Sequence, residues 1–447
     1  MNILIKTDLR QRTKNPLTWF IIFILCLMSM LNIIEMQKLR LNRPFQGHDI
    51  YSYGSSHHYD WSMSLDDRKK KLYPKAEFSL DLYTNIPKQI AKANEENNVK
   101  EVIRLMTFYH LLWAKTGYVT NDPIMNTVFY NKIINIWNEV SEGISYEKVD
   151  YYPYLPAFDT EKYALLTAQY YYQLYKNDFE PIYYDDINNT TYLYNYFFGI
   201  VPKFIVIISI IFIYNTINKE KNRGSLKLVF TQSVSRWEYY ISKWISGLIY
   251  IIFILLFPTI IISLLLGMKN GFISMKYPTL YIKDTMTSLK PIPNYFDIIK
   301  AKMGSYPWFN KTALGYYAPS HKTFVDVVAE HNKTELIPFY KYLLMVLLLT
   351  ILFIGFAVAL IQLISAIINH EIISFVVAIG VFIIGTLISS PFKYEKHLNL
   401  SPFTMENASR IIIGTYNVTA LTSILILLGF TILLLIIGVI YFNKKEI

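Results

Sequence analysis

The sequence predicts an all-α polytopic membrane protein with six transmembrane helices, both termini in the cytoplasm and a mainly helical extracellular domain between the first and second helices. Of its 447 residues, 53% are hydrophobic and only 17% are charged, whereas soluble domains carry roughly 25% charged residues. Apolar runs of about 18 residues or more are long enough to cross a bilayer as helices. This composition excludes a secreted enzyme, a disordered chain and a collagen-like fibre. The runs without any Asp, Glu, Lys or Arg are 17–34, 244–268, 342–369, 372–392 and 411–443.

Each segment follows from this pattern and from local signals. Pro16 separates a short basic stretch from the first apolar run, and proline interrupts or begins helices. From Ala76 onward, apolar residues recur at helical spacing, with a turn signal at Asn121-Asp122-Pro123. The expected segments are a cytoplasmic interfacial helix (1–16), the first span (17–34), a mainly helical extracellular domain (35–197), the second span (198–217), a cytoplasmic loop (218–243), the third span (244–267), a second extracellular segment (268–340), the fourth (341–364) and fifth (372–390) spans, an extracellular hairpin (391–418), the sixth span (419–442) and a cytoplasmic tail (443–447).

Basic residues cluster beside the spans and predict the orientation of the chain. They concentrate in residues 1–16, in the loop 218–243 and at Lys444-Lys445, and positive charge beside spans marks the cytoplasmic side. An even number of spans puts all three clusters on one face. Nucleic acid is not an expected partner, because each cluster adjoins a membrane span. The single cysteine, Cys26, lies in the first span, so the external segments depend on packing instead of disulfides.

Missing motifs indicate that the chain does not supply its own energy. The sequence contains no G-x-x-x-x-G-K-[ST] phosphate loop, no H-E-x-x-H pair and no G-x-S-x-G elbow. The predicted spans also lack Asp and Glu, which ion-driven carriers need at membrane depth. We therefore expect no catalytic residue, metal site or cofactor on this chain, and a transporter of this kind must draw its energy from another subunit.

The loop after the second span resembles the cytoplasmic loop of the ABC-2 family of ABC-transporter permeases. The matching residues are Glu220, Gly224-Ser225-Leu226, Ser235-Arg236 and Lys243. The approach to the first span through Asn15-Pro16 and the C-terminal Phe442-Asn443-Lys444-Lys445-Glu446 are similar to the same family, with Glu446 where the family has Asp. The external segments carry no matching motif.

This resemblance implies that the loop couples the permease to an ATPase. Apolar residues would seat a short helix in a groove of the ATPase and charged residues would orient it at the rim; a charged loop without any partner is the alternative. The expected coupling residues are Glu220, Arg223, Gly224, Leu226, Leu228, Val229, Phe230 and Arg236. ATP and Mg²⁺ are expected on the partner ATPase only.

A second group of residues is expected near the transport path. The resemblance implies that the segment 402–413 belongs to an outward hairpin that dips into the outer leaflet and gates the exit; the alternative is that it forms the first turn of the sixth span. Glu406 and Arg410 have the i,i+4 spacing of a helical pair. Lys203 either lines the path or extends to the interface. The possible pathway or gate residues are Lys203, Phe403, Glu406 and Arg410.

The function that these features imply is that of a permease subunit in an ATP-driven ABC exporter. The expected partners are cytoplasmic ATPase subunits, a second permease half, which is either a copy of this chain or a related one, and the lipid bilayer. The expected cargo is an amphipathic peptide, a lipid-like molecule or an antimicrobial compound. The expected location of the protein is the plasma membrane of a low-GC bacterium. The alternatives are a sensing and resistance module, whose external domain captures a toxin and signals to a kinase, and a membrane enzyme.

Overall fold

The computed structural model describes residues 1–41, 76–117, 123–149, 160–182, 186–231, 234–283, 285–289, 334–388, 400–413 and 418–444. Within these residues the fold is mostly helical, and six helical segments are long and apolar enough to cross a membrane. The prediction of a mostly helical chain with six helices able to span a membrane is therefore confirmed for the described residues. The spans are formed by α2 (Pro16–Leu41), the segment Asn189–Asn222, α13 (Arg236–Asn270), α16 (Phe339–Ile367), α17 (Glu371–Ile388) and α19 (Ala420–Lys444).

The second span begins earlier than the hydropathy pattern indicates. Asn188 caps α9 (Asn189–Asn195), accepting hydrogen bonds from the amides of Thr190 and Thr191, both at 2.9 Å. A π-helical turn, η3 (Tyr196–Ile200), connects α9 to α10 (Val201–Ile213). The helical segment thus starts at Asn189 instead of residue 198, because buried tyrosines extend it beyond the purely aliphatic stretch.

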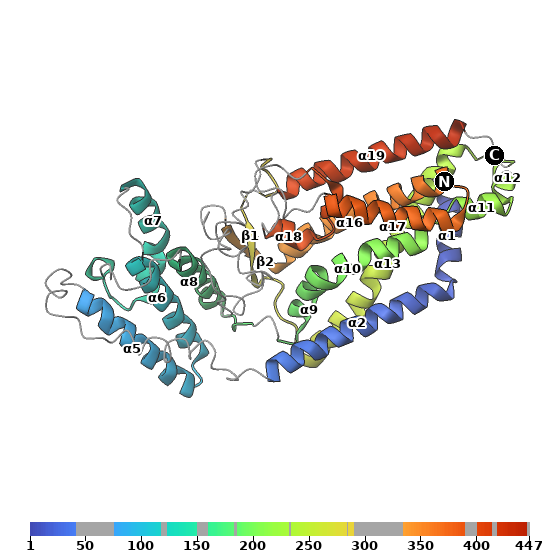
Figure 1. Cartoon of the computed structure of the whole chain (residues 1–447). Coiled ribbons are helices and arrows are strands. Elements are labelled where there is room, and N and C mark those ends of the chain that lie inside the picture. The colour runs from blue at the N-terminus through green and yellow to red at the C-terminus, as the bar shows by residue number, and fades with distance from the viewer. Residues whose placement is uncertain are drawn as a thin grey trace.

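The bundle has two distinct ends (Figure 1). At one end lie α1 (Asn2–Thr13), α11 (Asn218–Asn222), α12 (Ser225–Phe230) and the end of α19. We call this end the terminal face, because both chain termini are there. A helical domain lies beyond the opposite end, which we call the domain face. On the terminal face, α13 already begins at Arg236, so residues 236–243 of the predicted loop belong to the third span helix.

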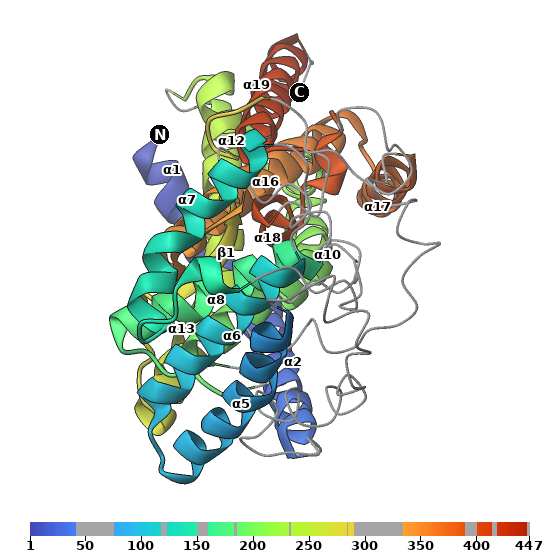
Figure 2. The same ribbon diagram turned by 90° about the vertical axis from the view of Figure 1, so that its left-hand side faces the viewer.

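The helical domain consists of α5 (Ala76–Glu95), α6 (Val99–Gly117), α7 (Pro123–Val140) and α8 (Thr160–Asn177), together with a short turn, η2 (Tyr146–Lys148). The helices lie close together (Figure 2). Their core contains fully buried side chains such as Leu111, Trp137 and Leu174. Tyr170 and Tyr171 are also buried, so this part of the tyrosine-rich sequence forms core. A mainly helical domain between the first and second spans agrees with the sequence pattern; its extracellular location stays a prediction.

A two-stranded antiparallel ribbon joins the helical domain to the bundle. Strand β1 (Pro278–Ile282) pairs with β2 (Thr334–Pro338), with Leu280 opposite Leu336. The hydroxyl of Tyr277, immediately before β1, is hydrogen-bonded to that of Tyr170 on α8 and accepts the amide of Ile182 at 2.8 Å. The carbonyl of Tyr277 accepts the amide of Phe339, the first residue of α16, at 2.9 Å. The domain is thus connected directly to a span. Residues 290–333 of the predicted second external segment lie outside the described residues.

The predicted hairpin between the last two spans contains two short helical pieces. These are η5 (Pro402–Thr404) and α18 (Ala408–Ile412), which pack against α16, α17, α19 and η3. They precede α19, so they are separate from the sixth span. Residues 389–399 and 414–417 of this segment are outside the described part of the chain.

Candidate functional site

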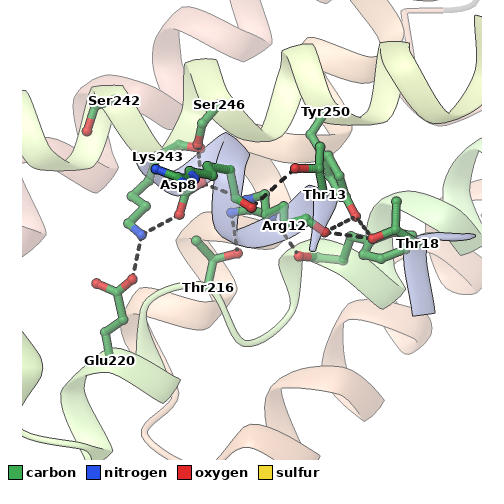
Figure 3. Close-up of polar contacts among 12 residues, drawn as sticks. Asp8, Arg12, Thr13, Thr18, Thr216, Glu220, Ser242, Lys243, Ser246 and Tyr250 are labelled. Carbon is green, nitrogen blue, oxygen red and sulfur yellow. Dashed lines mark hydrogen bonds and ion pairs between the residues drawn. The ribbon is translucent and has the colours of Figure 1, made fainter. Parts of the chain in front are cut away.

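A buried ionic network occupies the terminal face, where α1 crosses the start of α13. Asp8 of α1 is 8% exposed. One of its oxygens accepts the Lys243 ammonium at 2.6 Å, and the other accepts Arg12 Nε at 2.6 Å and the Ser246 hydroxyl at 2.5 Å. Asp8 and Arg12 are one helical turn apart on α1, and Lys243 and Ser246 are one turn apart on α13. Residues at these spacings share a helix face, so two facing helices supply these four side chains (Figure 3).

Glu220 of α11 extends the network to the loop after the second span. Its Oε1 lies 2.5 Å from the Lys243 ammonium, and its Oε2 accepts a hydrogen bond from the Tyr239 hydroxyl. Lys243 therefore bridges two carboxylates from different segments (Figure 3). The negative charges of Asp8 and Glu220 are matched by the positive charges of Lys243 and Arg12. A buried ion cluster is tolerated when it is neutral and well hydrogen-bonded.

Arg12 connects the same network to the second span and to the start of the first. Its guanidinium donates to the Phe212 carbonyl at 3.0 Å and to the Thr216 hydroxyl at 3.3 Å. The Arg12 carbonyl accepts the hydroxyl of Thr18 at 2.7 Å and that of Tyr250 at 3.2 Å. Four segments far apart in the sequence are thereby held together: α1, the start of α2, the end of α10 with its following turn, and α13 (Figure 3).

The ionic network stabilises the charged form of the Asp8 carboxylate. Burial by itself raises the pKa of Asp8, but the charges of Arg12 and Lys243 and their hydrogen bonds more than offset this and hold the pKa at about 2. Asp8 is consequently ionised at neutral pH. Sequence reasoning did not single out Asp8, although its spacing to Arg12 was visible.

The short helix α12 packs inward against the ends of three spans. Leu226 is 1% exposed and belongs to an apolar cluster with Tyr239, Tyr240 and Phe442. The Phe230 ring lies 6.1 Å from the Phe442 ring, centroid to centroid. This cluster, completed by Ile217 and Ala366, fastens the loop to α13, α16 and α19.

The predicted coupling residues therefore fall into an inward set and an outward set. Leu226 is buried, Val229 and Phe230 are half-buried on the apolar cluster, and Glu220 belongs to the ionic network. Arg236 donates to the carbonyl of Asn443 at 3.0 Å, next to the end of α19. Arg223 and Gly224 are exposed, and Gly224 has a positive φ of 71°, a conformation that suits glycine. The placement of the Leu228 side chain is not described.

The predicted gate residues lie nearer the domain face. The Phe403 ring packs against Phe356 of α16 and Phe382 of α17, at centroid distances of 5.5 and 5.6 Å. Burial raises the pKa of Glu406 to about 7. The Arg410 guanidinium lies 5.6 Å from the centre of the Phe198 ring. Because α18 begins at Ala408, Glu406 precedes the helix, and the structure shows no ion pair between Glu406 and Arg410 in the described residues.

One hydrogen bond joins this hairpin to the second span. Pro202 has no amide hydrogen, so the carbonyl of Phe198, four residues earlier, loses its usual helical donor. Asn407 donates its side-chain amide to this carbonyl at 3.1 Å, and its side-chain oxygen accepts the amide of Arg410 at 3.1 Å. Asn407 thus supports both the second span and the first turn of α18.

Lys203 lies apart from both groups. It occupies the first turn of α10 and is exposed, in the apolar part of a segment that begins at Asn189. Among the described residues, no group of three or more His, Cys, Asp or Glu side chains is placed to hold a metal ion.

Fold and site together define a class of protein: a multi-pass helical membrane protein whose short terminal-face helices are fastened to its spans by buried charge. A family model described as "ABC-2 family transporter protein" matches residues 1–447. The chain therefore belongs to the ABC-2 transporter family, and the resemblance found in its loop is confirmed. No curated protein and no solved structure matches it.

Proposed function

We propose that the chain is the permease subunit of an ATP-driven ABC exporter, and that a separate ATPase binds its terminal face. Family membership supports the permease role. The proposal puts the terminal face in the cytoplasm, because the basic residues beside the spans gather there. Amphipathic molecules, such as peptides or lipid-like compounds, are the proposed cargo, since they suit a path between apolar helices.

The observation that carries the proposal is the attachment of the loop to the spans. Glu220 is held by Lys243 of α13, and the amides of Ile217 and Asn218 donate to the Ser365 hydroxyl of α16 at 3.2 and 3.4 Å. A force on α11 or α12 is therefore transmitted to at least two spans as a rigid movement. This is the mechanical property that a coupling element needs.

The proposed contact surface is the exposed edge of the loop. Arg223 and Gly224 form the turn between α11 and α12 and are exposed, whereas Leu226 is engaged within the chain. We therefore place the ATPase contact at Arg223, Gly224 and the outer sides of Val229 and Phe230. The inward residues are proposed to transmit movement, and the exposed ones to receive it.

Lys203 supports the proposal of a second permease half. The structure shows an exposed lysine on a span, and within the described residues its ammonium has no ion pair or hydrogen bond. A charge facing lipid at this depth is costly, so such residues usually face a partner or a water-filled path. We propose that this face of α10 meets the other permease half, whether a copy or a related chain, and lines the path.

Copurification tests the ATPase contact. The change is Arg223→Glu in the full-length chain, purified from membranes of its own organism. Charge reversal at a rim contact weakens association, so we expect at least about a tenfold loss of copurifying ATPase (roughly 1.4 kcal/mol). Since Arg223 is exposed, the melting temperature of the chain should stay the same.

The matched control is Lys276→Glu, which reverses an exposed charge beside β1, at the other end of the bundle. It should retain the ATPase. Wild-type chain that brings down no nucleotide-hydrolysing protein would contradict the proposed function, and equal recovery with both variants would contradict the contact surface.

The sensing module has one supporting observation. The contact of Tyr277 with α8 and with the start of α16 gives the helical domain a direct connection to the bundle, as signalling from a captured ligand requires. A histidine kinase that copurifies with the chain would favour this second candidate.

A further inference from the structure

A cavity of about 360 Å³ lies beside the ionic network on the terminal face. Besides network residues, its lining includes Leu17 at the start of α2, Ile211 near the end of α10, Asn215 in the turn after α10, and Lys219 of α11. This volume lies within the range of small-molecule sites, about 300–1,000 Å³. The cavity is therefore large enough for a ligand headgroup.

The charge of the lining favours an anion. Three basic residues (Arg12, Lys219 and Lys243) and two acidic residues (Asp8 and Glu220) line the cavity. Both carboxylates are already occupied by Arg12 and Lys243. Lys219 remains as the uncompensated cation, because within the described residues its ammonium makes no hydrogen bond or ion pair.

The position of the cavity favours an anion with an apolar tail. Leu17 lies one residue after the start of α2, and Ile211 lies near the end of α10, so the cavity is at the level where the apolar spans meet the polar face. Leu17 is 40% exposed and Phe20, one turn further along α2, is 58% exposed. An apolar surface thus continues from the cavity along a span.

We propose that this cavity binds the phosphate of an anionic phospholipid, with its acyl chains along α2. Lys219 supplies the positive charge, and the neighbouring side-chain amide of Gln11 supplies a hydrogen-bond donor for the phosphate. The amide of Asn215, which donates to Glu371 at 3.3 Å, has a second hydrogen that remains for the ligand. The bound lipid would contact α1, α2 and α11 beside the ionic network, which already connects α1 and α11 to the spans. This site is separate from the proposed ATPase contact, and its binding is measured without the ATPase.

Native mass spectrometry of the purified full-length chain in detergent tests the site. Dioleoylphosphatidylglycerol is the probe, and dioleoylphosphatidylcholine, a lipid without net charge, is the comparison. We expect selective retention of phosphatidylglycerol. Lys219→Gln should weaken this binding about fivefold, since one cation near a lipid surface contributes roughly 1 kcal/mol, and Lys219→Arg should keep it within about twofold because the charge remains.

The matched control is Lys269→Gln, which removes an exposed cation from the last turn of α13, at the opposite end of the bundle. It should leave the affinity for phosphatidylglycerol unchanged. Equal retention of the two lipids, or equal losses from Lys219→Gln and Lys269→Gln, would overturn the proposal. So would full displacement of the lipid by millimolar inorganic phosphate, which would indicate a site for a soluble anion.

Discussion

At the residue scale, Lys243 is the centre of the terminal face. Its ammonium lies within 2.6 Å of Asp8 and 2.5 Å of Glu220, and the residue is only 7% exposed. Removing one member of a buried ion cluster leaves an uncompensated charge and typically costs about 3–5 kcal/mol. The network is therefore sensitive to the loss of any one of its members, which suits the proposed coupling role.

The pH dependence of Asp8 is the first prediction at this scale. Its pKa in the folded chain is about 2, below the ordinary value of 3.8. The resulting stabilisation is fully present above the unfolded pKa of about 3.8 and is lost as the pH falls towards 2; it amounts to about 2 kcal/mol. Thermal melts of the solubilised chain from pH 6 to pH 2 should show this loss.

Asp8→Asn removes the titrating group, so its melting temperature should start lower at pH 6 and fall less steeply below pH 4. Glu95→Gln is the control, because Glu95 is exposed in the helical domain and should follow the wild-type curve. A wild-type curve parallel to that of Asp8→Asn would show that Asp8 has no such depressed pKa.

Sequence reasoning found only part of the ionic network. Glu220 and Lys243 were noted because they match the family pattern. Asp8 was missed because an acidic residue in a basic segment resembles a solvated charge, and only the crossing of α1 and α13 shows that it is buried. Ser246 was missed because a single hydroxyl in an apolar span has no pattern of its own. The roles of Asp8 and Ser246 depend on packing between helices that are far apart in the sequence, and the spacing of residues along the chain does not reveal this packing.

At the scale of elements, close helix contacts depend on small residues. Gly438 of α19 faces Tyr240 of α13, and a Cβ atom there would lie 2.1 Å from the tyrosine hydroxyl oxygen. Tyr240 is fully buried, so the ring has little room to move. The crossing of α13 and α19 therefore requires glycine at residue 438.

Gly438→Ala should thus destabilise the purified chain by about 1–3 kcal/mol through overpacking, measured as a lower melting temperature. Gly429→Ala on the same helix is the matched control, because no atom lies within 4 Å of the added Cβ. Alanine there should be neutral or raise stability by up to about 1 kcal/mol through helix propensity. Equal effects of the two changes would contradict the close crossing.

The elements themselves were predictable to different degrees. Long apolar runs predicted the spans, because the thickness of the hydrocarbon sets a minimum helix length that can be recognised in the sequence. The second span was predicted although Lys203 interrupts its apolar run. The β1–β2 ribbon was not predicted, since its partners are separated by more than fifty residues and each strand is too short for a clear pattern. Pro202 was visible in the sequence, but its compensation by Asn407 depends on a hairpin two hundred residues away.

At the scale of the whole molecule, α16 connects the two ends. Its first residue bonds to Tyr277 beneath the helical domain. Near its other end, Gln362 donates to the carbonyl of Tyr240 at 2.8 Å, and Ser365 accepts the amides that begin the loop. A single buried helix therefore contacts both the domain junction and the proposed coupling element, so a change at either end reaches the other through packed atoms.

The last prediction is that the terminal face lies on the cytoplasmic side of the membrane. Because the chain has a single cysteine, this can be tested by labelling introduced thiols. A background with Cys26→Ala leaves no thiol. Arg223→Cys and Arg10→Cys then place single thiols at exposed positions of the terminal face, and Gln89→Cys places one at an exposed position of α5. If the basic residues mark the cytoplasmic side, a membrane-impermeant maleimide added to intact cells should label only Gln89→Cys.

Permeabilised and denatured cells supply the control, because all three thiols should then react equally. Labelling of Arg223→Cys and Arg10→Cys in intact cells would place the terminal face outside, where no ATP is available to a partner. The ATPase contact would then be wrong even though the family assignment stands, because the assignment depends on the sequence of the whole chain and the contact depends on which side that face occupies.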